Sequence, residues 1–129
     1  MNKSKLFLNL FCDKEADNFT AGQSVFKAGE SGETMYVVIE GEVEIVDGSL
    51  ILEVSGPGSI VGELALIDDE PRSASVIAKT DCRLVPVDRK RFQYMVQETP
   101  FFGLAVMKML ADRLRSKNVR TRSSVEVVS

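Results

Sequence analysis

The chain has 129 residues, and 44% of them are apolar, which is enough for the core of one compact domain. Its 16 basic and 19 acidic side chains give a formal net charge of −3, which argues against a domain built to coat nucleic acid or an anionic membrane. The chain has no histidine, and its two cysteines lack CxxC spacing, so zinc ligation and Cys–His catalysis lack their usual residues. We therefore expect a single domain over residues 1–129 that holds no metal, with Cys12 and Cys82 as small buried residues.

The N-terminal segment carries a short apolar run, Leu6 to Phe11, that predicts one or two turns of helix on the core. This run is too short for an export signal, and no small-residue cleavage site follows it. No other apolar run approaches the roughly 18 to 20 residues that a bilayer requires. We expect a cytoplasmic protein that does not contact a membrane.

The middle of the chain, from about residue 20 to about residue 87, predicts an all-β structure. Short β-branched runs alternate with glycine-containing turns, as expected for antiparallel strands. In the run from Glu42 to Val46, Val43 and Ile45 point to one side and the acids to the other. The pattern favours an antiparallel β-roll or jelly-roll barrel over an open sheet. The runs are SVFKAG, TMYVVIEG, EVEIVDG, LILEVSGPG, SASVIAKT and CRLVPV.

Two helices are predicted after the barrel, over about residues 88–118. Asp88 is suited to cap the first helix, and Pro100 is suited to the first turn of the second. The second helix carries one apolar stripe at Met107, Leu110 and Leu114 and a neighbouring one at Phe102, Val106 and Met109, so it could cover the barrel alone or also meet a partner helix. The polar residues 119–129 predict a flexible tail.

Residues 62–76, GELALIDDEPRSASV, lie between two strand signals. The part from Glu63 to Ile67 predicts a helical turn, whose unpaired N–H groups favour an anion. Gly62 and Ala65 would let a ligand approach the backbone, while Arg72 and Ser73 offer donors that suit phosphate oxygens.

Glu63 needs a different role, because a carboxylate repels phosphate. It is suited to accept a hydrogen bond from another part of the same ligand, such as a sugar hydroxyl. A phosphate and a hydroxyl together describe a nucleotide. The alternative interpretation is purely structural: Glu63 and Arg72 form a partly exposed ion pair with each other and bind no ligand. We assign no role to residues 68–70, DDE, because carboxylates on a phosphate would oppose binding.

These residues resemble the cyclic nucleotide-binding domains of protein kinase A regulatory subunits, cyclic-nucleotide-gated channels and bacterial catabolite activators. The phosphate-binding cassette of that family reads roughly Phe-Gly-Glu-x-Ala-Leu, a short loop, then Pro-Arg-x-Ala-Ser/Thr-Val. The chain has VGELAL at 61–66 and PRSASV at 71–76, and the similarity extends over about residues 20–90. Further matching residues are Gly22, the turn Gly29-Glu30-Ser31-Gly32, Met35-Tyr36, Glu40-Gly41 and Gly56-Pro57-Gly58.

The resemblance implies a role for each matching residue. Arg72 would pair with the cyclic phosphate, and Glu63 would accept from the ribose 2′-hydroxyl. Backbone N–H groups around Leu64 and Ala65 would complete the phosphate shell, and Gly62 would permit the close approach.

Two positions depart from the family or vary within it. Ser73 stands where kinase A members tend to have alanine, so it would add a phosphate contact or touch a guanine amine. Val61 stands where phenylalanine is frequent, which changes packing behind the cassette and removes no ligand contact.

The resemblance therefore implies a sensor that is not an enzyme. It would bind cyclic AMP in preference to cyclic GMP, with no metal, and signal through its C-terminal helices to an unidentified protein. The helix over 100–118 looks like that of the bacterial activators, where it forms a homodimer. Those activators carry a DNA-binding module after this helix, and the chain ends about where it would begin. The alternative is a degenerate, nucleotide-free β-roll that acts as a dimerisation or docking scaffold.

The basic residues of the last helix have two interpretations. They are most simply a solvated helix end that suits the helix dipole, while a nucleic acid or acidic partner is the alternative. The residues are Lys108, Arg113, Arg115, Lys117, Arg120 and Arg122.

Overall fold

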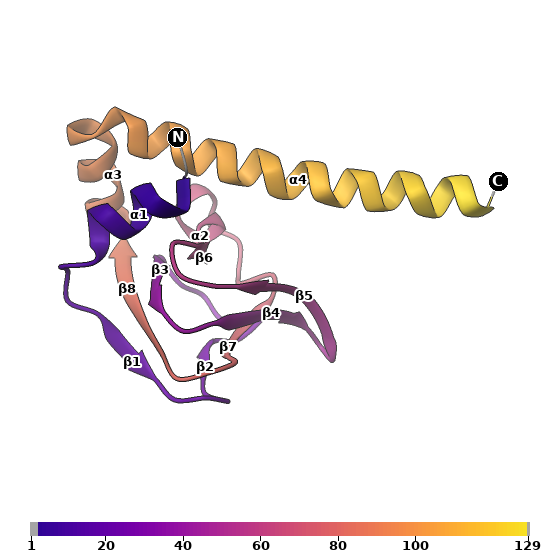
Figure 1. Ribbon diagram of the computed structural model, residues 1–129, viewed down its shortest axis with the longest axis horizontal. Coiled ribbons are helices and arrows are strands. Elements are labelled where there is room, and N and C mark those ends of the chain that lie inside the picture. Colours follow the sequence, from indigo (N-terminus) through magenta and orange to yellow (C-terminus); the bar gives the residue numbers. More distant parts are fainter. Residues whose placement is uncertain (1–2, 129) are drawn as a thin grey trace. The chain divides into compact units, whose positions relative to one another are not determined.

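The computed structural model describes the backbone of residues 3–128 and the side chains of residues 5–115. The chain divides into two compact units, Met1–Tyr94 and Met95–Ser129. The boundary lies inside helix α3 (Arg89–Glu98). All the strands and the helices α1 (Lys3–Phe11) and α2 (Leu64–Ile67) belong to the first unit, whereas α4 (Pro100–Val128) belongs to the second (Figure 1).

The first unit contains two four-stranded antiparallel sheets, in the orders β1-β8-β3-β6 and β2-β7-β4-β5. In the first sheet β8 lies between β1 and β3, and Val37 stands opposite Val85. In the second, β4 lies between β7 and β5, and Ile45 stands opposite Val76. The strands are β1 (Asp17–Phe19), β2 (Ser24–Phe26), β3 (Thr34–Glu40), β4 (Val43–Asp47), β5 (Leu50–Ser55), β6 (Ile60–Val61), β7 (Ser75–Ala78) and β8 (Cys82–Asp88).

The core lies between the two sheets, because both contribute to one cluster of buried side chains. Alternation along the strands places them there: in β7, Val76 and Ala78 are buried while Ser75 and Ile77 are half-buried. The cluster comprises Val38, Val43, Val61, Val76, Ala78, Cys82 and Leu84. Burial of this apolar surface is the main stabilising term for the β-roll.

Helix α1 contacts β3. Phe7 and Phe11 are four residues apart, so they lie on one face of α1, and both are buried. Among the described residues no helix is both long and apolar enough to cross a bilayer.

The mainly antiparallel β fold with flanking helices is confirmed, and so are several local features. Asp88 accepts a hydrogen bond from the Arg91 N–H at 2.8 Å, as a helix cap does. Helix α4 begins at Pro100. The strands β1 and β6 were not predicted, because three and two residues respectively are too few for an alternating pattern.

Two expectations are wrong. The backbone is helical through Val128, so no tail begins at residue 119; polarity does not end a helix, and residues 104–128 contain neither glycine nor proline. Cys12 is exposed, and only Cys82 is buried, because Cys12 follows the last residue of α1 instead of lying on its buried face. The side chains of Lys117, Arg120 and Arg122 lie outside the described residues.

Candidate functional site

The segment that resembles a phosphate-binding cassette leaves β6, turns at Gly62, forms the single turn of α2 and returns to β7. Gly62 has φ of +77°, a conformation that residues with a side chain rarely adopt. A Cβ at this position would lie 2.7 Å from Nη1 of Arg72 and 3.0 Å from the ring of Phe26. Glycine is therefore required here both for the turn and for the close approach of Arg72.

The main chain of Arg72 is anchored to the turn that follows β2. Its N–H donates to the Glu30 carbonyl at 2.8 Å, and its own carbonyl accepts from the Gly29 N–H at 2.8 Å. Nearby, the Ala28 N–H donates to the Ser75 hydroxyl at 2.9 Å. The returning half of the cassette is thus fixed to a segment more than forty residues earlier in the chain.

The Arg72 guanidinium is held by two backbone carbonyls and one aromatic ring. Nη1 donates to the Gly62 carbonyl at 3.0 Å, and Nη2 donates to the Thr34 carbonyl at 2.7 Å. Its Cζ atom lies 3.9 Å from the centroid of the Phe26 ring. On another side it approaches Gly32, where a Cβ would lie 2.7 Å from Nη2.

The guanidinium retains donor capacity. A guanidinium has five N–H groups, and its buried Nε has no hydrogen-bond acceptor within the described part of the chain. Burial lowers the pKa of Arg72, and the charges of Tyr36, Glu30 and Glu63 oppose that shift. A partly buried cation with a buried, unmatched donor favours an anionic ligand.

The buried carboxylate of Glu63 belongs to the same region. Its residue is 6% exposed and stands at the N-terminus of α2, where its side chain makes no capping hydrogen bond. Burial lowers the pKa of Arg72, and the negative charge of Glu63 acts to raise it. The structure therefore brings together the two charged residues that the sequence singled out.

The other candidate residues differ in exposure. Ala65 is buried, and its N–H donates to the Gly62 carbonyl at 3.3 Å, so that group is partly engaged. Leu64 is 49% exposed, and Ser73 is exposed too. Helix α2 has only four residues, so its dipole adds little, and most of the positive charge comes from Arg72.

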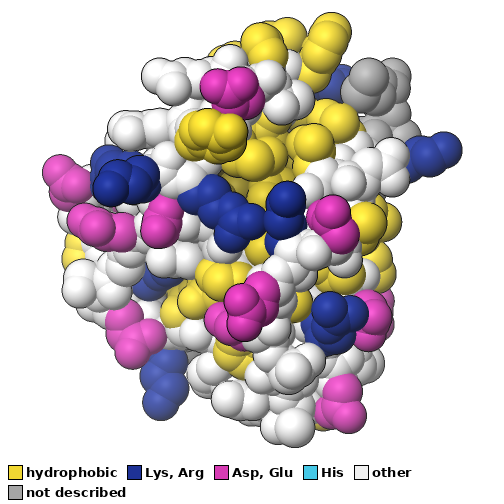
Figure 2. Space-filling view, turned by 90° about the vertical axis from the view of Figure 1, so that its left-hand side faces the viewer, with side chains coloured by type: hydrophobic (Ala, Val, Ile, Leu, Met, Phe, Trp, Pro, Cys, Tyr) yellow, Lys and Arg dark blue, Asp and Glu magenta, His cyan; other side chains and the backbone are white. Residues whose placement is uncertain are grey.

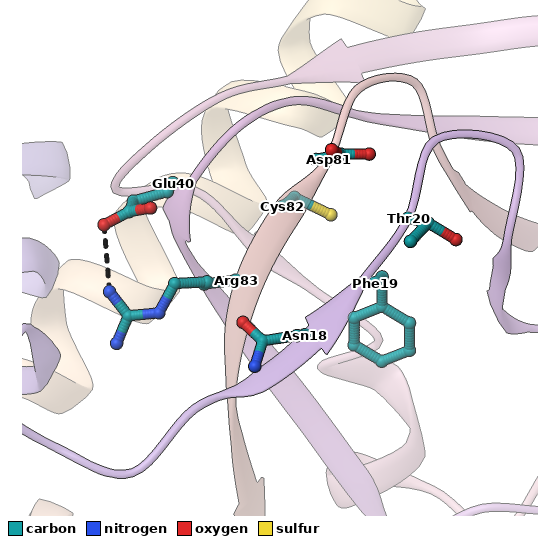
Figure 3. Close-up of a pocket in the computed structure, with 7 residues that line it drawn as sticks. All are labelled: Asn18, Phe19, Thr20, Glu40, Asp81, Cys82 and Arg83. Atoms are coloured by element: carbon teal, nitrogen blue, oxygen red, sulfur yellow. Dashed lines mark hydrogen bonds and ion pairs between the residues drawn. The ribbon is translucent and has the colours of Figure 1, made fainter.

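A separate hollow of about 330 Å³ lies at the β1–β8 side of the first sheet (Figure 3). Arg83 and Glu40 form an ion pair across 2.9 Å at one side of it, and the Asp81 carboxylate accepts a hydrogen bond from the Ala21 N–H. None of the six candidate residues lines this hollow. Its lining residues are Asn18, Phe19, Thr20, Glu40, Asp81, Cys82 and Arg83.

The surface charges and the acidic side chains bear on two other kinds of site, a surface of one charge sign and a metal centre. On the face drawn in Figure 2, basic and acidic side chains are interspersed, and no broad area of one sign forms. Within the described residues, no group of three or more Cys, Asp or Glu side chains could hold a metal ion.

Sequence reasoning missed four residues that shape the site: Phe26, Gly32, Thr34 and Arg89. Gly32 carried a signal, because it belongs to the matched turn at 29–32. Phe26 and Thr34 carried none, because their contacts with Arg72 span 46 and 38 residues. Arg89 donates to the Ala65 carbonyl at 3.2 Å and lies 3.6 Å from Asp69. The predicted Asp88 cap places Arg89 at the start of α3, but it does not indicate that Arg89 contacts the cassette.

Comparison with known families agrees with this geometry. The family model described as "Cyclic nucleotide-binding domain" matches residues 16–99. The chain belongs to this family. The match covers all eight strands, the cassette and α3.

Relatives of this cyclic nucleotide-binding domain include regulators from bacteria and fungi. It is 34% identical over 106 residues to the "CRP-like cAMP-activated global transcriptional regulator" of Mycobacterium tuberculosis, covering 78% of this chain and 47% of that protein. It is 37% identical over 81 residues to the "cAMP-dependent protein kinase regulatory subunit" of Yarrowia lipolytica, covering 63% of this chain and 21% of that protein. The chain thus spans less than half the length of these relatives.

Solved structures agree with the fold, and the sequence relatives include part of an enzyme. The catabolite activator protein of Thermus thermophilus superimposes with a TM-score of 0.77 at 26% identity, covering 93% of this chain and 57% of that one. The "Lysophospholipase NTE1" of Chaetomium globosum is 30% identical over 117 residues, but these make up 8% of that protein. The domain therefore occurs as a module within larger proteins of different activities.

Proposed function

We propose that this chain is a cytoplasmic sensor domain, not an enzyme, that binds a cyclic nucleotide monophosphate and prefers cyclic AMP to cyclic GMP. The cyclic phosphate pairs with Arg72 and with backbone N–H groups at Leu64 and Ala65. The ribose 2′-hydroxyl donates to Glu63, and Ser73 adds a hydroxyl contact. Gly62 provides the close approach of ligand and backbone.

One observation carries this proposal: the buried Nε of Arg72 has no acceptor among the described residues. A buried charged donor without a partner costs free energy. An anion at the cassette removes that cost, and the neighbouring buried carboxylate of Glu63 restricts the anion to one that also offers a hydroxyl.

The preference for adenine is supported by the relatives. Two proteins at 34% and 37% identity are described by name as cAMP-activated and cAMP-dependent. The preference for adenine over guanine rests on this similarity to named relatives.

We further propose that the two compact units act as one domain, in which ligand binding rearranges the C-terminal helices. The contact of Arg89 with Ala65 provides a starting point, because it joins α2 to the first residue of α3. A ligand that binds one arrangement of α2 more tightly would shift α3 through this contact.

Helix α4 is a candidate surface for a second copy of the chain or for a downstream protein. Phe102, Val106 and Met109 are buried, whereas four large apolar side chains of the helix are exposed: Phe101, Leu104, Met107 and Leu114. Their spacing places them on one stripe. Light scattering with and without cyclic AMP would report whether this stripe forms a homodimer.

Isothermal titration calorimetry with cyclic AMP, cyclic GMP and linear 5′-AMP tests the binding proposal. We expect heat with both cyclic nucleotides, tighter binding of cyclic AMP and weak binding of 5′-AMP. No heat with either cyclic nucleotide up to millimolar concentration would refute the proposal.

The alternative is a nucleotide-free scaffold, and two hydrogen bonds favour it. Arg72 already donates to the Thr34 and Gly62 carbonyls, so part of its hydrogen bonding is satisfied without ligand. Absence of binding together with a stable dimer would support the scaffold.

A further inference from the structure

The guanidinium of Arg72 lies in a slot made by three residues. The Phe26 ring covers one face, with 3.9 Å between its centroid and Cζ of Arg72. Gly62 and Gly32 lie at two edges, and a Cβ at either position would come within 2.7 Å of a terminal guanidinium nitrogen. The slot therefore has one aromatic wall and two walls of bare backbone.

The Phe26 ring is itself fixed by a row of aromatic side chains. It stacks on Tyr36, with centroids 6.3 Å apart and an interplanar angle of 29°. Tyr36 meets Phe19 edge to face, with centroids 6.4 Å apart and an angle of 86°. Offset stacked and edge-to-face pairs are the favourable aromatic arrangements. All three rings pack against the buried core cluster, so Phe26 has little freedom to leave the guanidinium.

The wall of the slot has a chemical consequence for ligand binding. A carboxylate beside Arg72 would stabilise its charge, but it would accept from the same in-plane N–H groups that a phosphate requires. An aromatic ring stabilises the charge through its face and accepts none of those hydrogen bonds. The cation can then remain charged in its partly buried position while donors in the guanidinium plane stay available.

We propose that Phe26 is a positioning residue for the nucleotide: its ring holds the Arg72 guanidinium in its slot by a cation–π contact, which keeps the donors of Arg72 available for the cyclic phosphate. This inference rests on the proposed function and adds to it a residue outside the cassette. Tyr36 acts one step further away, by holding the ring of Phe26.

Fluorination of the Phe26 ring tests the proposal. Genetically encoded 4-fluoro-, 3,5-difluoro- and 3,4,5-trifluorophenylalanine withdraw electrons from the ring face stepwise with little change of shape. We expect the calorimetric Kd for cyclic AMP to rise at each step, by roughly 2- to 30-fold over the series. A ring that acts only by filling space would show no graded response.

Phe19 provides the matched control, because it belongs to the same aromatic row and its described ring contact is with Tyr36. The same series at Phe19 should leave Kd unchanged. Phe26→Leu should weaken binding, and Phe26→Tyr, which keeps a π face, should largely restore it. Thermal unfolding of every variant identifies losses caused by unfolding.

The outcomes separate this inference from the proposed function. If the unmodified chain binds cyclic AMP but Kd is flat across the Phe26 series, or if the Phe19 series gives the same gradient, the inference is overturned and the proposed function stands. If the unmodified chain binds neither cyclic AMP nor cyclic GMP, both are overturned.

Discussion

Two regions of the same β-roll differ in whether their polar groups are paired: the cassette around Arg72 and the hollow at Asn18, Glu40, Asp81 and Arg83. The hollow offers about 330 Å³ of space, but the Arg83 guanidinium and the Asp81 carboxylate in it already have partners. The cassette contains a partly buried guanidinium whose buried Nε has no acceptor among the described residues.

This difference concerns what identifies a ligand site. An empty hollow at the exposed end of a sheet carries little free-energy penalty, because the polar side chains there pair with one another or with water. A buried donor without an acceptor does cost free energy, so it persists in a fold where a ligand uses it. The buried Nε donor of Arg72, which has no acceptor among the described residues, is therefore better support for a ligand site than the volume of the hollow.

The largest predicted effect is that of Arg72→Ala on nucleotide affinity. Loss of a charge-assisted contact to the phosphate should weaken cyclic AMP binding by about 1.5 to 3 kcal/mol, or roughly 10- to 150-fold. Calorimetry measures the change in Kd, and urea unfolding checks that the variant folds.

Arg83→Ala is the matched control in the hollow. Arg83 forms an exposed ion pair with Glu40, so its loss should leave Kd unchanged and reduce stability by about 1 kcal/mol or less. If Arg83→Ala weakened binding and Arg72→Ala did not, the ligand site would be the hollow.

The next largest effect is expected at Gly32. The added Cβ of Gly32→Ala would lie 2.7 Å from Nη2 and 2.9 Å from Nε of Arg72, and Gly32 does not have a positive φ. The guanidinium must move while the backbone accepts alanine. We expect about tenfold weaker binding of cyclic AMP, on the order of one charged hydrogen bond, with a small change in unfolding free energy.

Gly22→Ala separates strain from displacement of Arg72. Gly22 has φ of +88°, and no atom lies within 4 Å of its added Cβ. This variant should lose about 1 to 2 kcal/mol of stability through backbone strain and bind cyclic AMP normally. An affinity loss at Gly22 as large as that at Gly32 would mean that lower stability, and not the slot, reduces binding.

The contrast between the two regions also indicates what the sequence can predict. Gly62, Glu63 and Arg72 were identified because they lie within eleven residues of each other in a spacing that matches a family. The ring of Phe26 and the carbonyl of Thr34 reach Arg72 only through the pairing of distant strands and turns, which no local pattern encodes. The sequence therefore predicted the arginine but not the slot that holds it.

The same limit applies to the elements of the fold. The strands β3 and β8 were predicted because each is a seven-residue run rich in apolar and β-branched side chains. The strands β1 and β6 are defined by their partners β8 and β3 and not by their own residues. The end of α4 was missed because serine and charged residues are typical of both tails and exposed helices.

A smaller effect is expected where the cassette meets α3. Arg89→Gln removes the guanidinium that reaches the Ala65 carbonyl and Asp69. Loss of this partly exposed contact should raise the Kd for cyclic AMP by roughly two- to fivefold. Hydrogen exchange should show a weaker response of α3 to cyclic AMP, while the response of α2 remains.

Lys90→Gln is the control for Arg89, because it removes one positive charge from an exposed position next to it in the same helix. It should leave both the affinity and the exchange response unchanged. Equal effects of the two substitutions would assign the response to net charge and not to the contact with Ala65.

The smallest effect is expected at Cys82, which lines the hollow. Burial raises the pKa of its thiol above the ordinary value of 9.0, and the neighbouring Asp81 adds to the shift. As pH rises above 9 the unfolded chain therefore releases this proton before the folded chain does, so the folded state binds more protons and the unfolding free energy falls.

Alkylation by iodoacetamide checks this prediction in a Cys12→Ser background, because Cys12 is exposed and would react first. At pH 8 the folded chain should react much more slowly than the chain in urea, since the thiolate is the nucleophile. The decline in stability above pH 9 should be smaller in Cys82→Ala. Equal rates in the folded and unfolded chains would mean that the hollow exposes a reactive thiol, and it would then need consideration as a second site beside the cassette.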